Sequence, residues 1–115
     1  MARVTFNTQD IDRFNDRIQN VLQNPPCRGI YRNYLFQYKR MYLDAFKLWL
    51  EANDTKEYNE DKFLDLIEDV DEFNMNPLYS LQEHDHKIDY IKQECCRILE
   101  KTRASFIGYL RRHHM

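Results

Sequence analysis

Two histidines and two adjacent cysteines are the side chains of this sequence best suited to chemistry. His84 and His86 flank an aspartate, and Cys95 and Cys96 follow further along the same predicted helix. His, Cys and Asp are common zinc ligands, but residues two apart on a helix point to different faces, and neither histidine stands at a recognised zinc spacing from a cysteine. The third cysteine, Cys27, makes no Cys-x-x-Cys pair. We therefore expect no metal site, no cofactor, and reduced thiols in a cytoplasmic protein.

Catalytic motifs are also missing from the sequence. It contains no glycine-rich phosphate loop, no Gly-x-Ser-x-Gly nucleophile motif and no His-Glu-x-x-His. Cys95 falls on the apolar side of its predicted helix, where a cysteine acts as a small hydrophobic residue. We therefore predict that the chain is not an enzyme.

The element around which the other helices must pack is the segment Met41–Ala52. Its apolar residues lie on most sides of a helix, and it contains the only tryptophan, Trp49. A helix of this kind is normally buried in the middle of a domain. Glycine and proline are scarce, and no alternating strand pattern or long apolar run occurs. The sequence thus predicts a single all-α domain over residues 1–115, a compact bundle of five to seven helices around the central apolar helix (about 41–52) with no transmembrane segment.

The predicted first helix has clear ends. Asn7 is expected to cap its start, Asp10 lies three residues on near the positive end of the helix dipole, and the prolines after Asn24 end it. It is expected to run from about residue 8 to 23. Its apolar face consists of Ile11, Phe14, Ile18, Val21 and Leu22.

Further helical regions follow. One helix begins at Cys27, another covers about residues 59–73, and a capping box at residues 80–83 opens the last region. The last region would be about 45 Å long as one helix of about 30 residues, so a break is expected around residues 102–105. The inner stripe of the helix after Cys27 is Ile30, Tyr31, Tyr34, Leu35 and Tyr38.

Charge is unevenly distributed, although the net charge is only −2. Residues 51–72 are strongly acidic, whereas residues 97–115 are basic. One interpretation is that solvated helix faces attract each other across the fold. The other is a basic C-terminal edge for an acidic partner or a membrane surface. Both interpretations remain open at this point.

A second basic stretch mixes aromatic residues with arginine and lysine. Residues 31–40 have this pattern, which is typical of nucleic-acid-binding surfaces. Most of its aromatic residues, however, fall where the core needs them, and the chain as a whole is mildly acidic. Nucleic-acid binding is therefore the alternative function, through Arg28, Arg32, Lys39 and Arg40.

Residues 30–52 resemble the centre of a regulator of G-protein signalling (RGS) domain. The resemblance rests on Ile30-Tyr31-Arg32-Asn33-Tyr34-Leu35, on Phe46 at the family's spacing, and on Leu48-Trp49-Leu50-Glu51. Val21-Leu22-Gln23-Asn24-Pro25 resembles the opening of the family. The closing helices of the family are similar to three segments of this chain, Ile98-Leu99-Glu100-Lys101, Phe106 and Tyr109-Leu110.

The chain departs from this family where its members hold the switch regions of a Gα subunit. Leu43 stands where GTPase-activating members have an asparagine, Trp49 is displaced by two residues, and the segment between Phe73 and Ile88 is shorter than usual. The resemblance therefore implies a divergent member, of the kind in sorting nexins or axin-like scaffolds. Such a member binds a protein partner without stimulating GTP hydrolysis.

We thus predict a non-catalytic protein-protein interaction module, a scaffold in signalling. The sequence does not identify its partner or its oligomeric state. The residues expected to contact the partner come from the resemblance and from the acidic face of residues 60–72. They are Asn74, Asn76, Arg103, Asp65, Glu68, Asp69 and Glu72.

Overall fold

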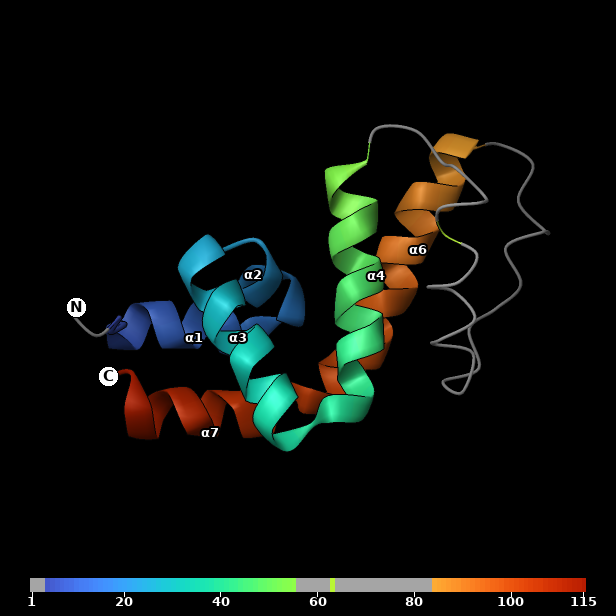
Figure 1. The fold of residues 1–115 in the computed structure, drawn as a ribbon. Helices are drawn as coiled ribbons and strands as arrows, with labels where there is room; N and C mark the ends of the chain where they lie inside the picture. The colour runs from blue at the N-terminus through green and yellow to red at the C-terminus, as the bar shows by residue number, and fades with distance from the viewer. Residues whose placement is uncertain (1–3, 56–62, 64–83) are drawn as a thin grey trace. The chain divides into compact units, whose positions relative to one another are not determined.

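The computed structural model describes residues 4–55, 63 and 84–115, and every regular element among them is helical. The predicted all-α fold is therefore confirmed (Figure 1). The chain divides into two compact units: Met1–Arg40 with Glu100–Met115 form the first unit, and Met41–Leu99 form the second. The prediction of one domain over the whole chain stays a prediction. None of the described helices is long and apolar enough to cross a membrane.

The predicted first helix is in fact two helices. In α1 (Thr8–Asp16) the expected Asn7 cap is confirmed: the Asn7 side chain accepts a hydrogen bond from the Asp10 N–H at 2.8 Å. The Asp10 carboxylate accepts one from the Asn7 N–H at 3.3 Å, which completes a capping box. α2 (Ile18–Leu22) begins only after Arg17, whose backbone is extended, with φ −159° and ψ 151°. The prediction of a continuous helix over residues 8 to 23 is therefore wrong.

Side chains of residues near the C-terminus form hydrogen bonds to the backbone on both sides of this break. The Ile18 N–H, at the start of α2, donates to the Glu100 carboxylate at 3.0 Å. The Arg103 guanidinium donates to the Asn15 carbonyl and, at 3.0 Å, to the Asn15 side-chain oxygen. These bonds replace some of those that helix ends lack, so the break is stabilised. The predicted apolar face is buried on both sides of the break: Ile11, Phe14, Ile18, Val21 and Leu22.

α3 (Pro25–Tyr38) starts two residues earlier than predicted. The Asn24 side chain accepts from the Cys27 N–H at 3.0 Å, and Pro25 and Pro26 occupy the first turn, where an N–H would have no partner in the helix. The predicted inner stripe is one turn too long, because Tyr38 is 60% exposed. A 3₁₀ turn, η1 (Arg40–Tyr42), follows.

In the second unit α4 (Leu43–Asp54) packs against α6 (His84–Leu99). α4 is the apolar helix predicted over residues 41–52, and Trp49 is only 2% exposed. Met41 was expected on that helix, but it lies in η1 and is 55% exposed. The Lys92 ammonium donates to the Asn53 side chain at 3.1 Å and lies 5.7 Å from the centre of the Trp49 ring. The helix predicted at 59–73 and the capping box at 80–83 lie outside the described residues, apart from Phe63, which is buried.

A second 3₁₀ turn, η4 (Glu100–Thr102), separates α6 from α7 (Arg103–His113). The break expected around residues 102–105 is thus present, although it begins slightly earlier. The N-terminal segment is tied to the end of α7: the Phe6 N–H donates to the His114 carbonyl at 2.6 Å, and the His114 ring Nδ1 lies 2.8 Å from the Val4 carbonyl. The two ends of the described chain therefore lie side by side (Figure 1).

Candidate functional site

Within the first unit, α3 and α7 contact each other through aromatic rings. The Tyr31 ring centre lies 4.8 Å from that of Phe106. The Tyr34 ring centre lies 5.3 Å from that of Phe106 and 5.2 Å from that of Tyr109. Aromatic pairs favour tilted arrangements at these distances, so the rings are a stable spacer between the two helices.

Hydroxyl groups fix the inner rings of this contact. The Tyr31 and Thr102 hydroxyls lie 2.6 Å apart in a buried hydrogen bond. The Tyr34 hydroxyl donates to the Ser105 hydroxyl at 2.7 Å, and Ser105 in turn donates to the Thr102 carbonyl at 3.1 Å. Such bonds give the tyrosines a defined position instead of a choice of rotamers.

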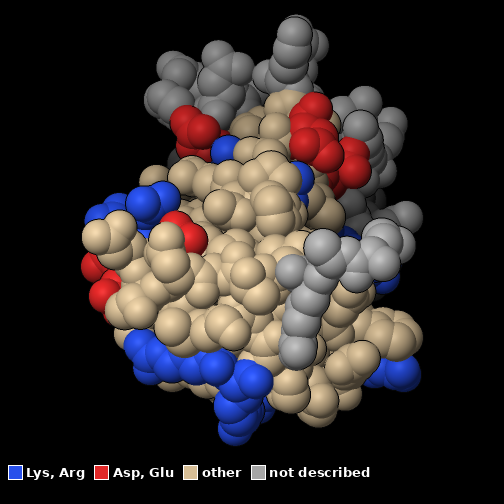
Figure 2. Space-filling view, turned by 90° about the vertical axis from the view of Figure 1, so that its left-hand side faces the viewer, with Lys and Arg blue, Asp and Glu red and all other residues tan. Residues whose placement is uncertain are grey.

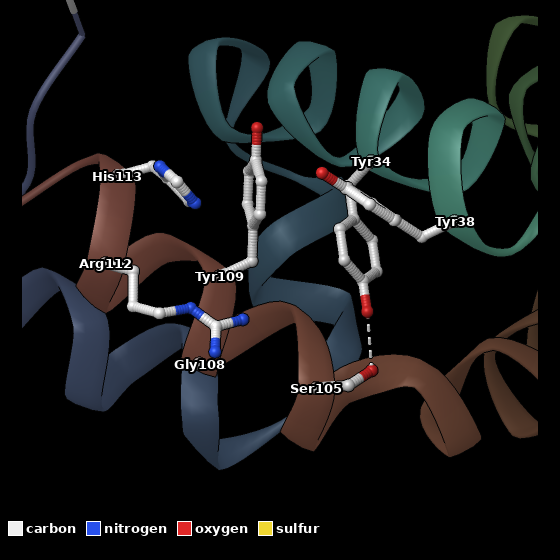
Figure 3. A pocket seen from close by; sticks show the side chains of 7 residues that line it. All are labelled: Tyr34, Tyr38, Ser105, Gly108, Tyr109, Arg112 and His113. Atoms are coloured by element: carbon white, nitrogen blue, oxygen red, sulfur yellow. Dashed lines mark hydrogen bonds between the residues drawn. The ribbon is translucent and has the colours of Figure 1, made fainter.

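Two hollows lie along this contact, and Tyr109 lines both. We call them together the α3–α7 groove. The larger hollow, of about 440 Å³, falls within the size range of small-ligand pockets. It is lined by Tyr34, Tyr38, Ser105, Gly108, Tyr109, Arg112 and His113 (Figure 3). The smaller hollow, of about 240 Å³, is lined by Ile30, Asn33, Phe36, Gln37, Tyr109 and His114.

The side chains enter the larger hollow from both helices. Figure 3 shows Tyr34 reaching down from α3, Tyr38 lying across the hollow with its hydroxyl towards Tyr109, and Tyr109 standing up from α7. Arg112 and His113 lie beside Tyr109 on the side away from Ser105. One end of the hollow is therefore cationic, and the other is closed by the hydrogen bond between Tyr34 and Ser105.

The charged side chains of the two groove helices are all basic. Neither α3 nor α7 contains an Asp or a Glu, in a chain whose net charge is negative. The exposed bases on these helices and at their ends are Arg32, Lys39, Arg40, Arg111 and Arg112. Figure 2 shows Lys and Arg gathered along the lower edge of the molecule, at the height at which Figure 1 draws α7. Such a surface attracts anionic ligands over a Debye length of about 10 Å.

Most of the partner-contact residues predicted from the sequence cannot be placed. Arg103 is described, and its guanidinium binds the Glu100 carboxylate and Asn15 within the first unit. Its role in the structure is to hold the break between α1 and α2, and contact with a partner stays a prediction. The remaining six lie outside the described residues: Asn74, Asn76, Asp65, Glu68, Asp69 and Glu72.

The bases of the alternative nucleic-acid face are all described. Arg28 is half-buried and donates to the Leu22 carbonyl at 3.3 Å, so it does not simply line the outside as expected. Arg32 and Lys39 are exposed. Arg40 is exposed as well, donates to the Phe36 carbonyl at 3.0 Å, and lies 4.4 Å from the centre of the exposed Phe36 ring.

The cysteines are structural. Cys27, Cys95 and Cys96 are reduced and buried. Burial raises the pKa of Cys27 to about 12, and burial together with the nearby Cys96 and Glu94 raises the pKa of Cys95 well above its usual range. A thiol with so high a pKa is a poor nucleophile at neutral pH, as expected of a cysteine that packs as a small apolar residue.

No metal centre is found in the part of the chain that the structure describes, because no three His, Cys, Asp or Glu side chains converge there. The side chains of His84, Asp85 and His86 lie outside that part.

Sequence reasoning missed the groove, although α7 carried a signal for it. Tyr109 and His113 are four residues apart and therefore share a helix face, and Gly108 is a glycine in the interior of the same helix. Tyr34 and Tyr38, which contact Tyr109 from α3, lie about 70 positions earlier in the chain, and periodicity within each helix does not predict how two helices align.

Comparison with family models, with curated proteins and with solved structures finds no match to this chain.

Proposed function

We propose that the chain is a non-catalytic protein-interaction module that binds an acidic segment of a partner protein along the α3–α7 groove. The observation that carries this proposal is the combination of exposed bases, tyrosine rings and the complete lack of carboxylates on both helices. Aromatic residues and arginine are the side chains most enriched at protein interfaces. Opposite charge gives such an interface its rate of association and its specificity.

The interaction also agrees with the charge pattern of the sequence. Two interpretations of the charge pattern were open: solvated helix faces that attract each other across the fold, or a basic C-terminal edge for an acidic partner or a membrane surface. Arg111 and Arg112 are exposed in the structure, so both side chains are available to a partner.

From the resemblance to RGS domains, the proposal adopts only the binding of a protein partner and not the stimulation of GTP hydrolysis. Leu43 and Trp49, at which the sequence departs from GTPase-activating members, are half-buried and buried. Neither offers the polar contact that would hold a GTPase switch in its transition-state form, and catalysis depends on such differential contacts. We expect no stimulation of GTP hydrolysis in a single-turnover assay with a panel of Gα subunits. Acceleration of about ten-fold or more, equivalent to about 1.4 kcal/mol of transition-state stabilisation, would contradict this.

Calorimetric titration with a short Glu-rich peptide tests the binding proposal directly. The wild-type protein is expected to bind it at low salt and more weakly at physiological salt, because screening reduces attraction between exposed charges. The double variant Arg111→Gln, Arg112→Gln is expected to lose most of this affinity. Lys47→Gln removes an exposed base from α4, in the second unit, and is the matched control. Equal loss in the control, or no loss in the double variant, would show that the groove is not the site.

The alternative is single-stranded nucleic acid, and one observation favours it. Arg40 stacks on the exposed Phe36 ring beside Arg32 and Lys39, and stacking platforms with a basic groove bind single strands. An oligouridine titrated under the same low-salt conditions separates the two functions. Tighter binding of oligouridine than of the Glu-rich peptide, lost in Arg32→Gln or Arg40→Gln, would replace the acidic protein segment by nucleic acid.

A further inference from the structure

We propose that the larger hollow of the groove, above Gly108, receives one aromatic side chain of the acidic partner segment, next to a carboxylate that meets Arg112. This inference rests on the proposed function and identifies what the bound segment must carry.

Three tyrosine rings form an open cup. The ring centres of Tyr34 and Tyr38 lie 5.4 Å apart, those of Tyr34 and Tyr109 lie 5.2 Å apart, and those of Tyr38 and Tyr109 lie 6.0 Å apart. The planes of these pairs are inclined by 45° to 58°, so the rings touch each other in tilted contacts, and the cup is the hollow that they line together with α7. A further ring placed in this cup makes edge-to-face contact with its walls, which is the arrangement that aromatic pairs favour.

Gly108 keeps the cup open on the α7 side. A Cβ atom built on this residue meets nothing within 4 Å, so the fold itself does not need a glycine there for lack of room. Glycine inside a helix is less favourable than alanine, and this glycine lines the hollow. A side chain at residue 108 would extend into open space beside this hollow.

The basic side chain at the edge of the cup favours an acidic residue next to the aromatic residue of the bound segment. Arg112 lines the hollow on the α7 side next to His113, and neither helix supplies a carboxylate to neutralise the Arg112 guanidinium. The Arg112 guanidinium can bind a carboxylate in a bidentate manner. An aromatic residue flanked by Glu or Asp satisfies both the cup and its rim, whereas an aliphatic side chain gains less from ring faces and edges.

The test uses two Glu-rich peptides that differ at one central position, Trp in one and Ser in the other. Calorimetric titration of the wild-type protein is expected to show the Trp peptide binding about ten-fold more tightly or better, which corresponds to about 1.4 kcal/mol. Gly108→Leu places a side chain in the cup and is expected to remove this preference while leaving weak binding of the Ser peptide. Gly29→Leu is the matched control, because Gly29 is also helical and open around its Cβ but lines neither hollow. A melting curve of each variant verifies that it is folded.

The outcomes separate this inference from the proposed function. If both peptides bind equally, or if Gly108→Leu keeps the preference for Trp, the cup is not an aromatic site, although the groove still binds acidic segments. If neither peptide binds at low salt, the proposed function is wrong, and the inference is wrong with it. If both leucine variants lose the preference, the effect is not local to the cup, and the inference is wrong.

Discussion

The two helix pairs of this molecule, α4 with α6 and α3 with α7, are built from different side chains. In the second unit α4 and α6 pack closely, and their buried residues include the small Ala45, Ala52 and Cys95. In the first unit Tyr34 and Tyr109 stand between α3 and α7. Small residues let helix backbones approach, whereas bulky rings with polar tips keep them apart.

This difference has a consequence for function. A closely packed pair buries its apolar surface and leaves little for a partner. The ring-spaced pair is held partly by hydroxyl bonds, such as that of Tyr34 to Ser105, and exposes Tyr38 and Phe36 around a hollow. Substitutions in α4 should therefore mainly lower the free energy of unfolding, and substitutions in α3 and α7 should mainly lower the affinity for a partner.

The largest expected effect contrasts two aromatic residues. Trp49→Ala should lower the free energy of unfolding by about 3–5 kcal/mol, because it leaves a cavity at a buried position. Tyr38→Ala removes an exposed ring from the groove and should cost less, about 1–3 kcal/mol, for its two ring contacts with Tyr34 and Tyr109. Urea denaturation of both variants measures the difference. A loss below about 1 kcal/mol for Trp49→Ala would show that α4 is not the core helix that this comparison needs.

The next effect concerns the break between α1 and α2. Arg103→Ala removes the hydrogen bonds that the guanidinium makes to Asn15 and Glu100, and bonds to charged groups are worth about 1.5–3 kcal/mol. Arg17→Ala, at the break itself, removes an exposed side chain and should stay within about 0.5 kcal/mol. Equal losses in the two variants would mean that the break does not depend on Arg103.

A smaller effect is expected at the hydroxyl bond beneath the groove. Tyr34→Phe keeps the ring but removes the donor to Ser105, at a cost of about 0.5–1.5 kcal/mol. The double variant Tyr34→Phe, Ser105→Ala should lose less than the sum of the single losses, because both partners of one bond are then gone. Additive losses in this double-mutant cycle would argue that the bond contributes nothing.

A further effect is confined to alkaline pH. Burial raises the pKa of Cys27 from 9.0 to about 12, so between these values the unfolded chain releases a proton that the folded chain keeps. Its contribution to stability is complete below pH 9 and is lost as the pH rises towards 12. The free energy of unfolding should therefore fall less steeply over this range in Cys27→Ala than in the wild type. Parallel curves would contradict the assignment.

Local sequence signals predicted the fold well, and distant contacts account for the errors. The capping box at Asn7 was predictable because its two partners are three residues apart. The break at Arg17 was not, because the carboxylate that binds the Ile18 N–H is 82 positions away. The apolar periodicity of the first helix continues through the break, so periodicity alone concealed it.

The candidate site illustrates the same limit. Tyr34 and Tyr38 were both expected on an inner stripe, since spacing along α3 does not tell a core ring from a groove ring. Only the position of Tyr109 on α7 decides that Tyr34 is buried and that Tyr38 forms a wall of the hollow.

The most direct test of the groove uses the two glycines of this chain as reporters. Selective ¹⁵N-glycine labelling gives one backbone amide signal from Gly108, within the hollow, and one from Gly29, outside both hollows. Titration with the Glu-rich Trp peptide is expected to shift the Gly108 signal strongly and the Gly29 signal little, and the Arg111→Gln, Arg112→Gln variant should suppress the shift. Binding by calorimetry with an unchanged Gly108 signal, or with the larger shift at Gly29, would contradict the account.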